Sequence, residues 1–261
     1  SKAVLERAGL VAEARAGDWR RLPAMLKALR TERERPLFVS SMIRLLDDCD
    51  DARKWPALRD ALSGTSPWVR AHATAAFEGQ LTAESLVALV SAARDPVRIV
   101  RVQAGRTLAG APEGLFAPDT RRAVDSAMAE FETAMHSRWG VAPAQAELGH
   151  YYLARRRPRD AAAAFERASQ LDPGEVAHVV SAAAAWHQSG DAARAEERLR
   201  SALRLAPAAP EAYRNLGNLL ALQGRRPEEI ALYQQAMARV PAAARFEFVQ
   251  RLAERSPGPK P

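Results

Sequence analysis

Apolar and small residues in the second half of the chain recur in one order, with a period of 34 residues. Each copy begins with a pair of apolar or small residues and a bulky residue three positions later. Three further pattern positions follow, of which the middle one is bulky, and the copy ends at a proline. The first copy consists of Leu148, Gly149, Tyr152, Ala161, Phe165, Ala168 and Pro173. The next two consist of Ala182, Ala183, Trp186, Ala195, Leu199, Ala202 and Pro207, and of Leu216, Gly217, Leu220, Glu229, Tyr233, Ala236 and Pro241. Apolar positions three and four apart predict helices, and proline ends a helix because it lacks an N–H. Each copy therefore predicts two helices joined by a turn.

A helix–turn–helix unit of this length resembles the tetratricopeptide repeat. The resemblance covers about residues 142–243. It implies that Gly149 lets two helices approach closely and that Phe165 fills the space between successive pairs. The sequence departs from the family pattern in places: Glu229 stands where a small residue is usual, and Gln145 where an aromatic is usual.

A looser period of 31 residues runs through the first half of the chain. The matching sets are Phe38, Val69 and Val100; Met42, Ala73 and Ala104; and Leu46, Phe77 and Leu108. The segments 66–71 and 95–101 resemble the first helices of HEAT-like repeats. In that family an Asp commonly pairs with an Arg six residues on, so the resemblance implies a pair between Asp95 and Arg101.

Four further helices are expected outside the two repeat patterns, over 1–17, 19–30, 115–138 and 243–255. The last should cap the stack, because the final repeat otherwise exposes an apolar face. We expect Phe246, Val249 and Leu252 to form its inward side. The proline-rich residues 256–261 are expected to be a disordered tail.

The predicted fold class is therefore all-α. We expect a right-handed helical-repeat solenoid with HEAT-like repeats and a long closing helix over 1–141. Three tetratricopeptide units and the capping helix follow over 142–255.

Composition narrows the function classes. The net charge is +7, and the excess arginine is shared by both halves instead of forming a stripe, so nucleic acid is not the expected ligand. The single cysteine, Cys49, excludes an internal disulfide and a cysteine-based zinc site. The sequence has no run of about 18 apolar residues, so no membrane span is expected.

Candidate chemical sites are few. The five histidines show no metal-binding spacing. Asp47–Asp51 lacks the alternating ligands and central glycine of a calcium loop, which favours an acidic loop between helices. The run Arg155–Arg159 falls in a turn, where a solvated loop is favoured over a phosphate site. Because no catalytic motif is present, we expect no enzyme, no cofactor and no metal.

The tetratricopeptide resemblance also implies a binding surface, since the first helix of each unit in that family lines a concave groove. The corresponding protein-binding candidates are Ala146, His150, Val180, Ala184, His187, Gln188, Arg214 and Asn218. Arg214 and Asn218 lie one turn apart on one helix face, which suits an acidic or amide group.

The order of the parts resembles the C-terminal half of certain bacterial multihaem c-type cytochromes. Their haem-bearing part carries Cys-x-x-Cys-His motifs, which this chain lacks. The resemblance implies an accessory scaffold in the periplasm or cell envelope; without it, a cytoplasmic location is expected.

The predicted function is a non-enzymatic scaffold that binds a peptide or partner protein. Two other classes remain open, a nucleic-acid-binding solenoid and an enzyme on a HEAT-like scaffold. Salt-dependent binding to generic DNA or RNA would indicate the first, and clustered buried carboxylates would indicate the second.

Overall fold

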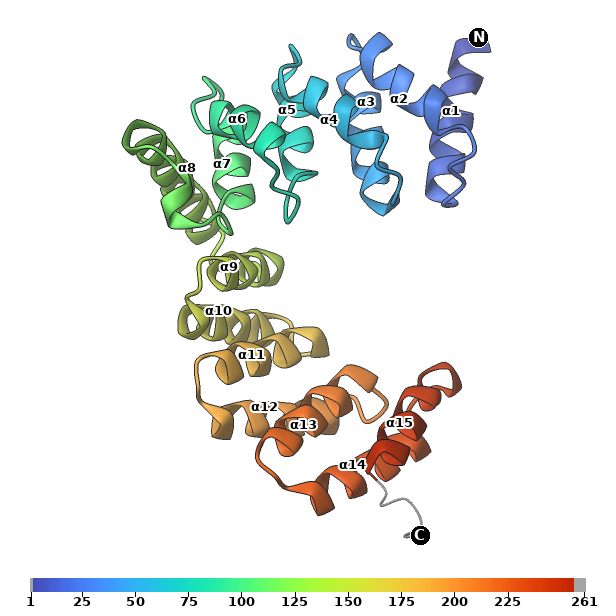
Figure 1. The fold of residues 1–261 in the computed structure, drawn as a ribbon, viewed down its shortest axis with the longest axis vertical. Helices are drawn as coiled ribbons and strands as arrows, with labels where there is room; N and C mark the ends of the chain where they lie inside the picture. The colour runs from blue at the N-terminus through green and yellow to red at the C-terminus, as the bar shows by residue number, and fades with distance from the viewer. Residues whose placement is uncertain (1, 256–261) are drawn as a thin grey trace. The chain divides into compact units, whose positions relative to one another are not determined.

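The computed structural model describes residues 2–255, and helices are its only regular secondary structure (Figure 1). The chain forms two compact units, the first ending at His136 and the second beginning at Ser137. The sequence pattern placed this division at 141/142. The predicted tail, 256–261, lies outside the described residues. Among those residues, no helix is both long enough and apolar enough to cross a membrane.

The first unit contains eight α-helices and two short 3₁₀ turns. The helices are α1 (Lys2–Arg15), α2 (Leu22–Thr31), α3 (Pro36–Leu45), α4 (Lys54–Leu62), α5 (Pro67–Ala75), α6 (Ala83–Ala92), α7 (Arg98–Thr107) and α8 (Pro118–His136). The 3₁₀ turns cover Leu46–Asp48 and Glu113–Leu115. The long helix therefore begins at Pro118 and not at 115, because a proline with its fixed φ favours the first turn of a helix.

The residues that form the core of this unit recur every 31 residues along the chain. Helix α5 packs against both α3 and α7, and the equivalent residues Met42, Ala73 and Ala104 are all fully buried. Helix α8 packs on α7 at a close approach, since a Cβ at Gly105 would lie 2.2 Å from the main-chain oxygen of Ala127. Small residues thus set the helix spacing.

Equivalent arginines link the successive repeats of the first unit. Arg70 donates to carbonyls in the loop before its own helix (2.9 and 3.0 Å) and to the carboxylate of Asp95 (2.7 and 3.0 Å). Arg101 likewise donates to the main-chain oxygen of Asp95 (2.8 Å) and to the carboxylate of Glu130 (2.8 and 3.1 Å). Arg101 thus contacts Asp95 as the resemblance implied, but at the main-chain oxygen and not at the carboxylate. The Asp95 carboxylate accepts hydrogen bonds from Arg70 of the preceding repeat and from the N–H of Val97 (2.8 Å).

Over residues 137–255, the second unit contains seven α-helices that follow one another as hairpins (Figure 1). They are α9 (Ala142–Ala154), α10 (Pro158–Leu171), α11 (Val176–Gln188), α12 (Ala192–Leu205), α13 (Pro210–Leu222), α14 (Arg226–Arg239) and α15 (Ala242–Arg255). The three repeat copies coincide with the hairpins α9–α10, α11–α12 and α13–α14. The helical-repeat prediction is confirmed here.

Two glycines show how tightly the paired helices pack. A Cβ at Gly149 of α9 would lie 2.7 Å from the ring of Phe165 in α10, and one at Gly217 of α13 would lie 2.3 Å from the ring of Tyr233 in α14. These contacts are too short for a side chain at either glycine. In the middle hairpin the equivalent residues are Ala183 and the smaller Leu199, both buried.

The capping helix α15 turns a different side inward from the one predicted. Phe248 is fully buried, with its ring 6.2 Å from that of Tyr213 and 5.8 Å from that of Tyr233. Phe246 and Val249 are 68% and 44% exposed. Residues two apart lie on nearly opposite sides of a helix, so the aromatic contact that holds Phe248 turns Phe246 to the surface. The predicted inward side was therefore wrong for these two residues, whereas Leu252 is half-buried.

Candidate functional site

The eight candidate binding residues all lie on the first helices of the three hairpins, α9, α11 and α13. Because the hairpins repeat every 34 residues, equivalent positions recur on the same side of each hairpin. We call this set the first-helix face. It comprises Ala146, His150, Val180, Ala184, His187, Gln188, Arg214 and Asn218.

Exposure divides the first-helix face into three groups. His150, His187, Gln188 and Asn218 are exposed, whereas Ala146, Ala184 and Arg214 are half-buried. Val180 is only 8% exposed and packs in an apolar cluster with Val179, Ala202, Ala209 and Ala212. The surface available on α9 and α11 is therefore two half-buried alanines beside two imidazoles and an amide.

Arg214 binds a carboxylate that belongs to the same chain. Its guanidinium donates two hydrogen bonds to Glu247 of α15, at 2.8 and 2.7 Å. This bond, with a second from Arg251, lowers the pKa of Glu247 to about 2, although burial acts in the opposite direction. Arg214 thus recognises an acid as its residue type suggests, but the acid is supplied by the capping helix.

Asn218 is engaged by the same helix. Its side-chain oxygen accepts a hydrogen bond from Arg251 at 2.9 Å, and Arg251 also binds Glu247 at 2.9 Å and lies 5.8 Å from the centre of the Tyr233 ring. Arg214 and Asn218 therefore dock α15 onto α13 and leave less of α13 available to a partner. The partners lie 33 residues apart in the sequence, so the sequence pattern carried no signal for this contact.

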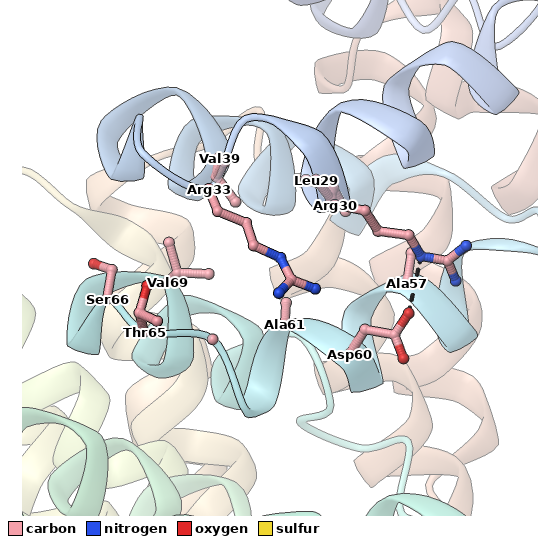
Figure 2. A pocket seen from close by; sticks show the side chains of 11 residues that line it. Leu29, Arg30, Arg33, Val39, Ala57, Asp60, Ala61, Thr65, Ser66 and Val69 are labelled. Carbon is pink, nitrogen blue, oxygen red and sulfur yellow. Dashed lines mark hydrogen bonds and ion pairs between the residues drawn. The ribbon is translucent and has the colours of Figure 1, made fainter.

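A small cavity between α2 and α4 in the first unit is not suited to a ligand. Figure 2 shows its lining, where Arg33 extends into the space between α2 and α4 and Arg30 pairs with Asp60 at 2.8 Å. Leu29, Val39 and other apolar side chains form the walls. Its volume of about 20 Å³ holds little more than one water molecule. We interpret it as a gap in the packing between repeats.

The acidic loop between α3 and α4 is engaged by neighbouring cations. Arg53 binds Asp51 through its side chain (2.6 and 3.0 Å) and its main-chain N–H, which lowers the pKa of Asp51 to about 2. Buried Lys54 donates to the Leu46 carbonyl at 2.9 Å. Within residues 2–255, no group of three or more histidine, cysteine or acidic side chains is placed to hold a metal ion.

Comparisons with known proteins give only distant similarities. No family model matches the chain, and no curated protein sequence does. Among solved structures, a crystal structure of MamA is 15% identical, with a TM-score of 0.44, and the match covers 79% of this chain and 98% of that one. A second MamA structure is 16% identical, with a TM-score of 0.42 and coverages of 66% and 94%.

A third similar structure is the complex of the TPR2AB domain of yeast Sti1 with pHSP90. It is 13% identical to this chain, with a TM-score of 0.40, and the match covers 97% of this chain and 99% of that one. Identities and TM-scores this low transfer neither a ligand nor an activity. The all-α repeat architecture rests on the helices and their packing described above.

Proposed function

We propose that this chain is a non-enzymatic protein-interaction scaffold whose second unit binds a peptide or partner protein on the first-helix face. The observation that carries the proposal is the surface of α9 and α11, where Ala146 and Ala184 lie beside exposed His150, His187 and Gln188. Alanines allow a partner's backbone to approach closely. Imidazole and amide groups supply directional hydrogen bonds.

The repetition of the hairpins also supports this function. Equivalent positions recur from one hairpin to the next, so an extended ligand meets similar contacts along its length. The HEAT-like interpretation of the first unit is retained as part of this proposal. The implied link to a multihaem cytochrome finds no support in the comparisons and is not needed here.

A site-specific photo-crosslinking experiment tests the proposal. A photoreactive residue is placed at Ala184 in the full chain, expressed in the source cell, and a control is placed at exposed Gln234 of α14. We expect a protein adduct from position 184 that position 234 does not give. The identified partner is then purified and titrated against Ala184→Glu and the control Gln234→Glu.

The Ala184→Glu change should weaken binding by about tenfold or more, because it adds a charged side chain where the partner's backbone approaches. The Gln234→Glu affinity should equal that of the wild type. The same adduct from both positions, or an unchanged affinity for Ala184→Glu, would remove the site from this face.

A further inference from the structure

The turn between α9 and α10 contains a residue in an unfavourable backbone conformation. Arg156 has a φ of 55°, and among residues 2–255 it is the only residue other than glycine with a positive φ. The equivalent residues of the other two hairpins are Gly190 (86°) and Gly224 (71°). An L-residue with a side chain is disfavoured in this region because Cβ approaches the neighbouring carbonyl.

The three turns are otherwise built alike. The residue after the positive-φ position donates its N–H to a carbonyl five residues earlier in each hairpin, at 2.8, 3.0 and 3.0 Å. The repeat therefore imposes the conformation, and glycine is the residue that fits it. An arginine at a position that suits glycine points to a role outside the fold.

The arginines around this turn are mostly unpaired. The side chains of Arg155, Arg156 and Arg159 have no hydrogen-bond or ion-pair partner among the described residues. Arg157, by contrast, binds Asp160 at 2.7 Å. The equivalent arginine of the third turn, Arg225, binds both Glu196 (2.6 Å) and Glu228 (2.6 Å). Arg225 is thus paired as its equivalent Arg157 is. The positions equivalent to Arg155, Arg156 and Arg159 carry no cation in the other two hairpins, where they are Ser189, Gly190 and Ala193, and Gln223, Gly224 and Pro227. Unpaired positive charge at these positions is therefore a property of the first turn.

An open hollow of about 680 Å³ adjoins this turn. Its lining includes Arg159, Trp186, Asp191 and Arg194. The guanidinium of Arg194 lies 4.5 Å from the centre of the Trp186 ring and 3.3 Å from Asp191. Trp186 is only 9% exposed and its ring is covered by Arg194, so the hollow presents chiefly the two cations, and Asp191 is already engaged by Arg194.

We propose that the arginine turn, Arg155 to Arg159 together with Arg194, binds an acidic segment of a partner protein. Five arginines there face two aspartates, Asp160 and Asp191, so the surface favours carboxylates. The hollow, whose accessible apolar lining is Ala192 and Ala193, takes an apolar side chain of that segment. A protein segment fits better than nucleic acid, because the charge is confined to one turn and does not form the stripe that a phosphate backbone follows.

This inference rests on the proposed function only in treating the chain as a protein-binding scaffold. The arginine turn shares no residue with the first-helix face. The two are tested apart.

The test is fluorescence anisotropy with the full chain and a labelled glutamate-rich peptide that carries one central leucine. A peptide with glutamine in place of glutamate is the neutral control. The variants are Arg156→Gly, the double change Arg155→Gln with Arg159→Gln, and a matched double change of exposed, unpaired arginines elsewhere in the unit, Arg204→Gln with Arg239→Gln.

We expect the Arg155/Arg159 double variant to bind the acidic peptide about tenfold more weakly, and the matched control to bind as the wild type does. Arg156→Gly should weaken binding severalfold while raising the denaturant midpoint of unfolding. A variant that is more stable than the wild type but binds the peptide more weakly has not lost affinity through unfolding.

Several outcomes overturn the inference. Failure of the acidic peptide to bind at low salt would leave the site without a ligand of this class. Equal losses of peptide affinity in the two double variants would show that the arginine turn is not special. An Arg156→Gly variant that binds the peptide as tightly as the wild type would show that Arg156 has no role. If a single-stranded DNA of equal charge binds more tightly than the acidic peptide, and the same arginine substitutions weaken its binding, then the turn is a nucleic-acid surface. If Ala184→Glu abolishes binding and the arginine variants do not, the peptide binds the first-helix face; the proposed function then survives and this inference fails.

Discussion

Close contact between one glycine and one aromatic ring sets the spacing of the helices in a hairpin. Gly217→Ala should destabilise the second unit by about 1–3 kcal/mol, because its Cβ would lie 2.3 Å from the Tyr233 ring. Urea unfolding followed by circular dichroism measures this change.

The middle hairpin supplies the rescue. It carries Ala183 and Leu199 at the equivalent positions, so Tyr233→Leu should recover part of the stability of the Gly217→Ala variant. The two single variants and the double variant form a thermodynamic cycle. Additive losses would show that the two positions do not interact.

At the residue scale, the sequence predicted the repeat positions well and the partners of charged groups poorly. Small and aromatic positions such as Gly149 and Phe165 follow from the period, because each is defined by its own hairpin. Arg214 has a partner that lies 33 residues away on another helix, Glu247. A periodic pattern shows which side of a helix a residue lies on, but it does not identify the charge that faces it.

At the scale of the element, the capping helix is held by one buried aromatic ring. Phe248→Ala should cost about 3–5 kcal/mol, since Phe248 is fully buried between Tyr213 and Tyr233. Phe246→Ala removes an equally large side chain that is 68% exposed, and it should change stability by less than about 0.5 kcal/mol. Thermal unfolding of both variants measures the difference, and similar losses would contradict the observed rotation of α15.

The ion pairs of α15 should make its docking dependent on pH. The pKa of Glu247 falls from 4.5 to about 2 in the folded state, chiefly because Arg214 hydrogen-bonds to it. A carboxyl group with a lowered pKa stabilises the fold above its unfolded pKa, and the contribution is lost as the pH falls towards the folded pKa. The stability difference between the wild type and Glu247→Gln should therefore be full at neutral pH and shrink between about pH 4.5 and 2.

Urea titrations of both proteins across that range measure the difference. Glu34→Gln is a suitable control, since Glu34 is an exposed carboxylate of the first unit with no ion-pair partner among the described residues. If the difference in unfolding free energy between the wild type and Glu247→Gln does not vary with pH, the charge of Glu247 makes no contribution to stability.

The sequence predicted the existence of the capping helix but not its orientation. Phe246, Val249 and Leu252 are spaced as a regular apolar stripe, and Phe248 lies outside that stripe. Tertiary contact with Tyr213 and Tyr233, together with the ion pairs to α13, outweighs the local stripe. The predicted start of α8, residue 115, was also wrong, because the helix starts at Pro118.

At the scale of the whole molecule, each unit has its own core. The first is built around residues such as Met42 and Ala104, and the second around residues such as Phe165 and Tyr233, all fully buried. We therefore expect the fragments 1–136 and 137–261 to fold separately. Each should show a helical circular dichroism spectrum and a cooperative thermal transition, and the two spectra should add up to that of the intact chain. A fragment that remains unfolded at low temperature would show that the units depend on each other.

The pairing of glycine with a large ring also restricts how one hairpin can diverge from another after duplication. A change from glycine to alanine at the Gly217 position meets the ring of Tyr233 and must displace it. A change from tyrosine to leucine leaves only a cavity, whose cost grows by about 24 cal/mol for each Å³ and which a later methyl group partly fills. The middle hairpin, with Ala183 and Leu199, is therefore most readily reached by a lineage in which the ring was lost before the methyl group was gained. Divergence in the opposite direction requires the reverse order, with the methyl group lost before the ring arrives.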